Sequence, residues 1–476
     1  MPLIIPANSI TGGYEVDNSL RFDDGSSDNL SRTFGTPSSG TTWTISFWVK
    51  KSTNGSALNL CSRLVDGSNE DRIRFTSGDA LEWSVYKSGG YAGRLVTTRV
   101  FRDNSAFYNI VCVWDTTNGT AGDRMRMYVN GVEETSFSTD TNPSLNETSI
   151  FNTSGTNYIG SVGSGEYFNG TMAHVHFIDG TAYNASTFGQ TDATTGIWSP
   201  KTAPSVTYGT NGFFLKFASA GSLGTDSSGN GNNFTLSGSG TQTQDTPSNV
   251  FATLNALTLA AAQYTLANGN LSTNGNGSNA WRSIFSTLGV TQGKYYFEMK
   301  VNSIEGTDLN NFVLGICDIE QIGVSASNGK FFGTSRGYGY HAKDGKKLNN
   351  DTVTANGVAY GSSWTTNDII GCAFDLDNGK LYWSKNGTWQ NSGNPESGAT
   401  GTGSAFNVTT GYTYVPVLAN YYSAEKVSFN FGNGYFGTTA VSSAQSPSDG
   451  IGLFEYSVPN GYKALCTKSI NSQEYS

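Results

Sequence analysis

The chain has 476 residues and a formal net charge of −9, and 13% of its residues are aromatic. An acidic chain without a basic patch is not expected to bind nucleic acid, and no apolar run reaches the length of a membrane-spanning helix. With 59 glycines and short apolar runs between turn residues, the composition is typical of β-sandwiches or barrels. At about 150 residues per domain, the length suggests two large domains or three small ones.

The first element is expected to be an N-terminal arm, residues 1–18. It opens with the apolar run MPLIIPANSI, which has neither helix nor strand periodicity and lacks the basic region of a signal peptide. Such an arm cannot bury its own apolar surface. We therefore expect it to dock on a domain or on a neighbouring subunit, and we expect the protein to form a homo-oligomer.

A first β-rich domain is predicted over residues 19–238. Within it, residues 109–137 show the alternation of a strand with two buried faces. One face carries Ile110, Cys112 and Trp114, and the other carries Val111 and Val113. This pattern favours a central strand of a sandwich.

Two histidines near the end of this domain, His174 and His176, have the spacing that places both imidazoles on one strand face. One interpretation is a metal site, although no third ligand can be identified from the sequence. The alternative is a pair of solvent-facing side chains opposite the apolar Val175 and Phe177.

A tight loop further on offers oxygen ligands of the kind that calcium prefers, at Asp226, Asn230 and Asn232. The alternative is a turn whose Gly and Asn residues accommodate positive φ. Calcium is the one cofactor that the sequence suggests.

The segment 239–250 is predicted to be a linker, because it is rich in Ser, Thr and Gln and shows no periodicity. A second β-rich domain is then predicted over 251–436. Its stretch 368–390 contains two Asn-Gly pairs, which are strong hairpin signals, and reads as a three-stranded meander. Its apolar face is predicted to bury Phe374, Leu376, Leu381 and Trp383.

Residues 437–476 are expected to form a C-terminal tail. Its apolar side chains raise the same question as the N-terminal arm, since they need a surface to cover them. We therefore expect at least one end of the chain to dock on a partner chain. The apolar side chains of the tail are Leu453, Phe454, Tyr456 and Leu465.

Catalytic and redox motifs are not recognisable in the sequence. The five cysteines form no CxxC pair, which fits synthesis in a reducing cytoplasm. The strand-borne E-x-D-x-E carboxylates that glucanases use are missing, so catalysis is not expected.

Aromatic side chains near predicted loops are the candidate ligand contacts, because sugars stack their apolar faces on rings. Trp43, Trp48, Trp114 and Trp383 lie within strand patterns and are predicted to be core residues instead. Packing under a loop is the alternative for each candidate. The candidates are Tyr91, Trp198, Trp389, Tyr421 and Tyr422.

The second domain resembles a SPRY domain. The segments that carry the resemblance are GKYYFEMKV (293–301), NFVLGICD (311–318), DIIGCAFDLDNGKLYWSKNGTW (368–389) and YVPVLANYYSAEKVSFNFG (414–432). The resemblance implies a bent antiparallel β-sandwich that binds ligands, usually proteins, without catalysis.

The first domain resembles the concanavalin A-like, laminin-G-type jelly roll. The matching segments are TWTISFWVK (42–50), RMRMYVNGVE (124–133) and YIGSVGSGEYFNGTMAHVHFIDG (158–180). The block 213–238 resembles a segment that usually opens such domains but here closes one. Because the ends of a jelly roll are often close in space, we expect this block to pair within the first sandwich. The fold class is therefore all-β, with two antiparallel β-sandwich domains of jelly-roll type in tandem.

Further segments along the whole chain include MPLIIPANSITGGYEVDNSLRF (1–22), FIDGTAYNASTFGQTDATTGIWSPK (177–201) and GTDSSGNGNNF (224–234). With these segments, the chain as a whole resembles tail-fibre-like and other surface proteins of bacteriophage virions. This resemblance implies a non-enzymatic virion protein, made in the bacterial cytoplasm, that attaches to a host-surface glycan or protein receptor and contacts other virion proteins. The alternatives are a structural head-decoration or tail-assembly protein and, more weakly, a glycan hydrolase.

Overall fold

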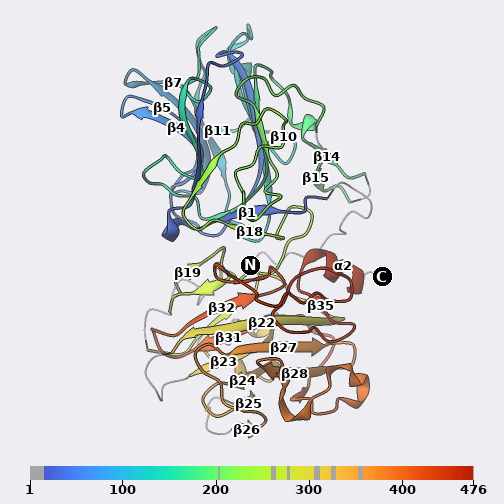
Figure 1. Cartoon of the computed structure of the whole chain (residues 1–476). Coiled ribbons are helices and arrows are strands. Elements are labelled where there is room, and N and C mark those ends of the chain that lie inside the picture. Colours follow the sequence, from blue (N-terminus) through green and yellow to red (C-terminus); the bar gives the residue numbers. More distant parts are fainter. Residues whose placement is uncertain are drawn as a thin grey trace. The chain divides into compact units, whose positions relative to one another are not determined.

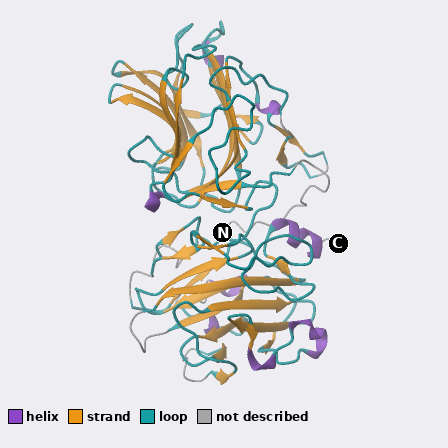
Figure 2. Cartoon of the chain, viewed as in Figure 1, coloured by secondary structure: helices purple, strands orange, loops and turns teal. Residues whose placement is uncertain are grey.

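The computed structural model describes residues 15–193, 195–201, 204–258, 264–275, 279–304, 311–322, 329–351 and 357–474. This part of the chain divides between Ser248 and Asn249 into two compact units. Figure 2 shows that strands dominate both of them and that the helical segments are short. Most of the expected arm, residues 1–14, lies outside the described residues, so its docking stays a prediction.

The first unit contains two eight-stranded antiparallel sheets. The sheet named here the β3 sheet has the order β10 (Val132–Glu133), β9 (Met125–Val129), β8 (Tyr108–Asp115), β3 (Thr42–Lys51), β13 (Gly170–Asp179), β1 (Ser19–Phe22), β18 (Thr241–Thr243), with β16 (Phe213–Leu215) also on β13. The β5 sheet has the order β11 (Phe137–Thr141), β7 (Gly90–Val100), β6 (Ala80–Lys87), β5 (Asn69–Phe75), β4 (Leu58–Asp66), β12 (Gly155–Ile159), β2 (Asn29–Phe34), β17 (Thr235–Ser237). A separate hairpin joins β14 (Gly189–Thr191) to β15 (Trp198–Pro200).

The two sheets enclose a core that contains three mutually contacting tryptophans. The rings of Trp43 and Trp83 lie 5.2 Å apart, and those of Trp83 and Trp114 lie 6.0 Å apart. Aromatic pairs at these distances stabilise a core beyond their area burial. Strand β8 lies between β9 and β3 and is buried on both faces, which confirms the expectation of a central strand.

The closing block of the first domain pairs as expected. Strand β16 pairs with β13, and β17 pairs with β2, so the prediction that residues 213–238 complete the first sandwich is confirmed. The structure continues this pattern into the segment expected to be a linker, because β18 pairs with β1 through Thr241 to Thr243. The backbone groups of β1 that would otherwise face water at the sheet edge are thereby satisfied.

The outer face of the β3 sheet is apolar and lies under a long connection of the same unit. Packed together on this face are the side chains of Val111, Val113, Tyr128 and Ile178 from the sheet and those of Phe188, Trp198 and Tyr208 from the connection. A strand that is buried on both faces has a nearly continuous apolar sequence. Strand β8, with the sequence YNIVCVWD, is such a strand.

The second unit contains a nine-stranded and a six-stranded sheet. The β22 sheet has the order β19 (Leu266–Ala267), β20 (Ser272–Thr273), β32 (Lys426–Asn430), β22 (Lys294–Ser303), β27 (Ile369–Asp375), β28 (Lys380–Lys385), β29 (Thr388–Trp389), with β30 (Phe406–Asn407) on β28 and β35 (Lys463–Ala464) on β22. The β23 sheet has the order β21 (Arg282–Phe285), β31 (Tyr414–Asn420), β23 (Phe312–Asp318), β24 (Gly337–His341), β25 (Lys346–Asn349), β26 (Val358–Ala359). A hairpin of β33 (Tyr435–Phe436) and β34 (Thr439–Ala440) and the helix α2 (Thr467–Glu474) follow.

Short 3-10 turns connect the strands of both units. They span Asp24–Ser26, Ala121–Asp123, Ala185–Thr187, Ile319–Gln321, Phe331–Gly333, Gln390–Ser392 and Pro395–Thr400. No helix in the described ranges is long and apolar enough to cross a membrane. The architecture is thus all-β, with two antiparallel sandwiches in tandem, as the sequence predicts (Figure 1).

The meander predicted over 368–390 is present as β27, β28 and β29. Its second turn has positive φ at both central residues, 50° at Asn386 and 80° at Gly387, as a type I′ turn requires. Phe374, Leu376 and Leu381 are buried, and so is Trp383. The prediction of a buried meander face is confirmed.

The C-terminal residues pack on the outer face of the β22 sheet. Phe454 lies 5.1 Å from the ring of Tyr296, and Tyr462 joins the same cluster together with Tyr382. Strand β35 pairs in parallel with β22. Phe454 and Leu465, which were expected to need a partner surface, are therefore buried within the chain itself.

The side chain of Glu298 on β22 binds the C-terminal segment through hydrogen bonds. Its carboxylate accepts hydrogen bonds from the backbone N–H groups of Glu455 and Tyr456, both at 2.9 Å, and from the side chains of Tyr296 and Asn430. Burial raises the pKa of Glu298 to about 7, although these donors act in the opposite direction. Four donors on one buried carboxylate make it the polar anchor of the segment.

The Glu298→Gln variant is expected to lose about 1–3 kcal/mol of unfolding free energy, since its amide N–H₂ would oppose an N–H donor in a buried place. Urea unfolding measures the loss, and hydrogen exchange at Glu455 and Tyr456 reports release of the segment. Glu320→Gln, whose side chain is largely exposed, is the matched control. Equal unfolding curves for the two variants would contradict the anchoring role.

Candidate functional site

The outer face of the β5 sheet carries six charged side chains of alternating sign. Together they are called the charged ladder: Glu70, Arg72, Glu166, Arg74, Glu82 and Arg94. Strands β5, β6 and β7 supply five of them, because alternate residues of a strand point to the same side. Glu166 comes from the loop between β12 and β13. The ladder begins with the ion pair of Glu70 and Arg72.

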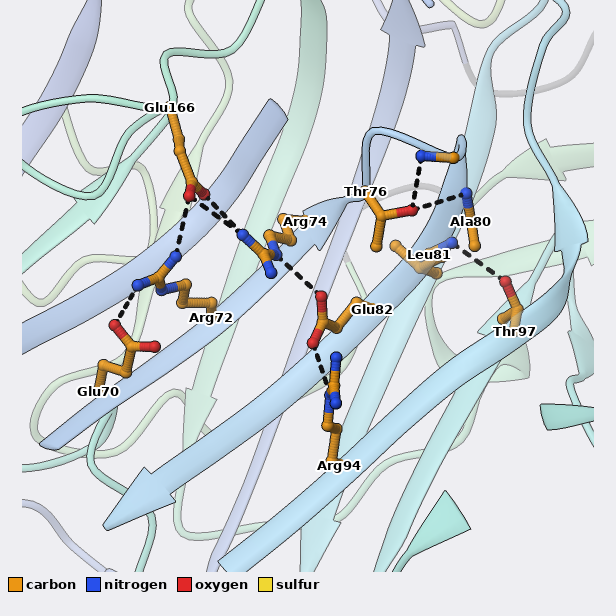
Figure 3. Close-up of polar contacts among 11 residues, drawn as sticks. Glu70, Arg72, Arg74, Thr76, Ala80, Leu81, Glu82, Arg94, Thr97 and Glu166 are labelled. Carbon is orange, nitrogen blue, oxygen red and sulfur yellow. Dashed lines mark hydrogen bonds and ion pairs between the residues drawn. The ribbon is translucent and has the colours of Figure 1, made fainter. Parts of the chain in front are cut away.

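From Arg72, further ion pairs connect Glu166, Arg74, Glu82 and Arg94 in that order (Figure 3). Nη1 of Arg72 lies 3.0 Å from Oε1 of Glu166, and Nη1 of Arg74 lies 3.0 Å from the other oxygen. Nε of Arg74 donates to Oε2 of Glu82 at 2.9 Å. Oε1 of Glu82 accepts from Nε of Arg94 at 2.8 Å. The ladder therefore has no net charge, and each link fixes the orientation of the next side chain.

Glu82 is the centre of this arrangement, with a side chain only 1% exposed. A carboxylate at such depth is tolerated because both oxygens are paired. Burial lowers the pKa of Arg74, but Glu82 and Glu166 outweigh burial and raise the pKa above its ordinary value. Arg74 thus stays charged, and the Glu82 carboxylate keeps its partner.

Glu166 reaches the ladder from a left-handed backbone conformation, with φ of 46°. Positive φ is uncommon for residues other than glycine. The backbone carbonyl of Glu166 accepts from the N–H of Asn59 on β4 at 3.0 Å. The loop is therefore fixed on the sheet at the same residue whose carboxylate joins Arg72 and Arg74.

Two tyrosines extend the charged ladder at one end. Tyr86 and Tyr91 face each other across β6 and β7, with ring centroids 5.0 Å apart. The guanidinium carbon of Arg94 lies 4.6 Å from the centroid of the Tyr91 ring. Tyr91 is 48% exposed. This end of the face therefore offers an open aromatic ring beside fixed polar groups, which suits a ligand with both apolar and polar edges.

The charged ladder is suited to hydrogen bonding and not to proton transfer. Glycoside hydrolysis needs a pair of carboxyl groups of which one stays protonated, whereas an arginine partner favours the ionised form. Burial does raise the pKa of Asp71 to about 7. That carboxyl, however, lies in the core and accepts from Trp83 and from the backbone of Phe151, out of reach of a substrate.

The five aromatic candidates from the sequence lie in four places, because only Tyr421 and Tyr422 are together. Tyr91 is on the β5 sheet, whereas Trp198 packs over the β3 sheet, where the missing side chains of Gly131 and Gly189 leave room for its ring. Nε1 of Trp198 donates to Asn109 at 3.0 Å. Trp198 is thus half-buried, and Tyr91 has the more open ring.

In the second unit, Trp389 is half-buried beside Tyr296, with ring centroids 6.3 Å apart. Tyr421 and Tyr422 form an edge-to-face pair at 4.9 Å, and the ring of Trp281 lies 5.8 Å from Tyr421. The structure therefore brings Tyr421 and Tyr422 together and adds Trp281, which sequence reasoning did not select.

The loop considered for calcium is a hydrogen-bonded turn. The carboxylate of Asp226 accepts from the N–H groups of Phe214 and Asn232, at 2.9 and 2.8 Å. The side-chain amides of Asn230 and Asn232 both donate to the carbonyl of Gly212. These contacts agree with the turn interpretation, and calcium binding at this loop stays a prediction.

His174 and His176 are both buried, so the expectation that they face solvent is wrong. The rings of Phe188 and Tyr208 lie beside His176, and the ring of His176 stacks on Phe214 with a centroid distance of 3.8 Å. Nδ1 of His176 hydrogen-bonds the Tyr208 hydroxyl at 2.9 Å. Within the described ranges, no group of three metal-ligating side chains occurs.

Sequence reasoning missed the charged ladder as a unit. The alternation of Glu70, Arg72 and Arg74 with buried residues is visible in the stretch NEDRIRF. A pattern of carboxylates on one strand does not include Glu82 and Glu166, because they come from different elements. Strand pairing brings Glu82 opposite Arg74, and the loop between β12 and β13 brings Glu166 to Arg72 and Arg74.

Comparison with known families agrees with the two units. Residues 24–187 match the family model of the concanavalin A-like lectin/glucanases superfamily, and residues 294–434 match that of the SPRY domain. The chain therefore contains a concanavalin A-like domain followed by a SPRY domain, as the motifs indicated.

Curated relatives share only a short region with this chain. It is 34% identical over 108 residues to the ATP-dependent RNA helicase DDX1 of Xenopus laevis, which is 22% of this chain and 12% of that protein. It is 34% identical over 96 residues to the Ran-binding proteins 9/10 homolog of Drosophila melanogaster, which is 20% of this chain and 9% of that protein. The chain thus spans about a tenth of the length of these relatives.

Two solved structures show partial similarity. The SPRY domain of human HERC1 is 21% identical and covers 35% of this chain and 91% of that chain, with a TM-score of 0.27. The SAP-like pentraxin from Limulus polyphemus is 14% identical and covers 47% of this chain and 95% of that chain, with a TM-score of 0.30.

The Glu82→Gln variant is expected to lose about 1–3 kcal/mol of unfolding free energy, because two partly buried arginines lose their shared charge partner. The control is Glu134→Gln, whose partner Arg99 is 46% exposed. Its expected loss is within about 1 kcal/mol. Urea unfolding compares the two variants, and a similar small loss in both would show that the ladder does not depend on Glu82.

Acid is expected to destabilise the first unit through its histidine pair. Burial lowers the pKa of His174 to about 3 and that of His176 well below its ordinary value. The unfolded chain therefore takes up protons below about pH 6.5 while the fold does not, so stability is lost as the pH falls, at up to about 1.4 kcal/mol per pH unit for each histidine.

The variant His176→Phe keeps a ring against Phe214 and cannot titrate. Its unfolding free energy relative to the wild type is expected to rise as the pH falls from 6.5 to 4, measured by urea unfolding at each pH. A difference that stays constant over this range would contradict the predicted acid sensitivity of His176.

Proposed function

We propose that this chain is a non-catalytic recognition protein that binds a glycan on the outer face of the β5 sheet. The observation that carries the proposal is the exposed Tyr91 ring beside the charged ladder, whose side chains are already fixed by one another. Polar groups that are ordered before binding lose little conformational entropy when a ligand arrives.

We further propose that the protein belongs to a bacteriophage virion, is made in the host cytoplasm and attaches the particle to a host-surface glycan or receptor. This part of the proposal rests on the whole-chain sequence resemblance. The curated relatives come from Xenopus laevis and Drosophila melanogaster and lend it no support.

The SPRY domain favours a second candidate function, because SPRY-type sandwiches commonly bind proteins. In that reading the second unit contacts other virion subunits, including further copies of this chain, and the protein has a structural role in head decoration or tail assembly. The two functions are compatible, since they use different units.

A glycan array probed with the purified full chain tests the first proposal. We expect binding to surface polysaccharides, a loss of about tenfold or more for Tyr91→Ala, since a ring–sugar contact is worth 1 kcal/mol or more, and no change for Val132→Ala. Val132 is an exposed residue at the edge of the β3 sheet and serves as the matched control.

Absence of any glycan binding, together with co-purification with virion subunits, would favour the structural role instead. Release of reducing sugar ends from a bound glycan would contradict the non-catalytic assignment. Antibodies against the chain that fail to label phage particles would remove the virion assignment.

A further inference from the structure

Arg94 occupies a special position in the charged ladder, because it is the terminal arginine. Its Nε donates to Oε1 of Glu82 at 2.8 Å, and the other oxygen of Glu82 is held by Arg74. Its guanidinium also lies over the Tyr91 ring, at 4.6 Å. Two contacts therefore fix the plane of the guanidinium, one along the Nε edge and one on the face.

The two terminal nitrogens of Arg94 remain available. Among the described residues they make no hydrogen bond, and the side chain is 29% exposed. The other two arginines of the ladder use terminal nitrogens for Glu70 and Glu166. Arg94 thus presents the forked end of its guanidinium, which matches a carboxylate or sulfate with two parallel hydrogen bonds.

An aromatic surface lies directly beside this fork. Tyr91 is exposed, and Tyr86 supports it edge to face at 5.0 Å. The hydroxyl of Tyr86 donates to the carbonyl of Gly89 at 2.7 Å, which fixes its ring on the hairpin. The Arg94 guanidinium covers one face of the Tyr91 ring, so a sugar that packs on the exposed part of the ring would reach the terminal nitrogens of Arg94 past the ring edge.

We propose that Arg94 and Tyr91 form a subsite for an acidic sugar, with the sugar ring on Tyr91 and its oxyanion on the terminal nitrogens of Arg94. The proposal rests on the proposed glycan-binding function and adds the chemical class of the ligand. The oxyanion is a carboxylate or a sulfate ester, which share the same recognition chemistry.

The charges nearby are consistent with an anionic ligand at this point. Glu82 is buried and neutralised by its two arginines, and Glu70 is paired with Arg72. The chain as a whole carries a net charge of −9, so long-range attraction does not favour an anion, and screening limits such effects to about 8 Å in physiological salt. Selectivity must therefore come from direct contact with the fork.

The experiment measures binding of the full chain by titration calorimetry to four matched oligosaccharides. Oligogalacturonate and its methyl ester differ only in the carboxylate, and a sulfated galactan and its desulfated form differ only in the sulfate. We expect at least one acidic member to bind about tenfold or more tightly than its neutral counterpart, as one charge-assisted hydrogen bond suffices for that ratio. Which acidic member binds identifies the oxyanion.

Variants locate the contact. Arg94→Gln is expected to abolish the preference for the acidic sugar, and Arg94→Lys to keep a smaller preference, since it retains the charge but not the fork. Tyr91→Ala leaves the ion pairs of Glu82 with Arg74 and Arg94 intact. It is expected to weaken the binding of acidic and neutral sugars to the same extent. Arg99→Gln on the same strand, where the arginine pairs with Glu134, is the control and should behave like the wild type.

Failure of the subsite and failure of the proposed function give different results. Equal binding of acidic and neutral sugars by the wild type, or an unchanged preference in Arg94→Gln, would overturn the acidic subsite and leave glycan binding in place. No binding of any oligosaccharide would overturn both. Thermal unfolding of each variant verifies that Arg94→Gln is folded, and Tyr91→Ala tests the same subsite without altering the ladder.

Discussion

In a β-sandwich, the partner sheet buries the inner face of each sheet. The outer face must either be covered by other segments of the chain or carry polar side chains that water can solvate. The structure depends on how each outer face meets this requirement. The β3 sheet has an apolar outer face, which side chains such as Phe188, Trp198 and Tyr208 cover. The β22 sheet also has an apolar outer face, under the C-terminal residues and their anchor on Glu298. The β5 sheet instead pairs charges along its outer face. A face closed by its own ion pairs is the one that can contact a ligand without displacing part of the fold.

Local patterns in the sequence were sufficient to predict some of the strands and their buried faces. Period-two alternation identified the faces of β8 and of the meander that contains Trp383, because side chains alternate strictly along a strand. The placement of β16 and β17 in the first sandwich also followed from a recognisable block. In contrast, the surroundings of His176 could not be predicted, because the residues that cover it come from segments far along the chain, such as Tyr208 and Phe214.

The candidate site was only partly accessible from the sequence for the same reason. Tyr91 was selected because it lies near a predicted loop or strand end, and it does lie at one end of the ladder. Strand pairing brings Glu82 next to Arg74. Glu166 reaches the ladder from a loop in which it has a left-handed backbone conformation. An alternation of charge along a single strand, as in Glu70, Arg72 and Arg74, is the local signal of such a face, but it does not reveal the cross-strand partners.

Stability alone does not explain the charged ladder. Ion pairs between exposed side chains are worth about 0–1 kcal/mol each, and the burial of Glu82 is unfavourable unless both of its oxygens are paired. A sheet surface of threonines would avoid that penalty, and threonine has a higher β-propensity than glutamate. What the ladder provides is orientation, since Glu82 determines the plane of Arg94 and leaves its forked end toward solvent beside Tyr91. In the proposed function, a fixed donor pair next to an exposed ring discriminates ligands by geometry, and this requirement accounts for a buried carboxylate at the centre of an outward-facing surface.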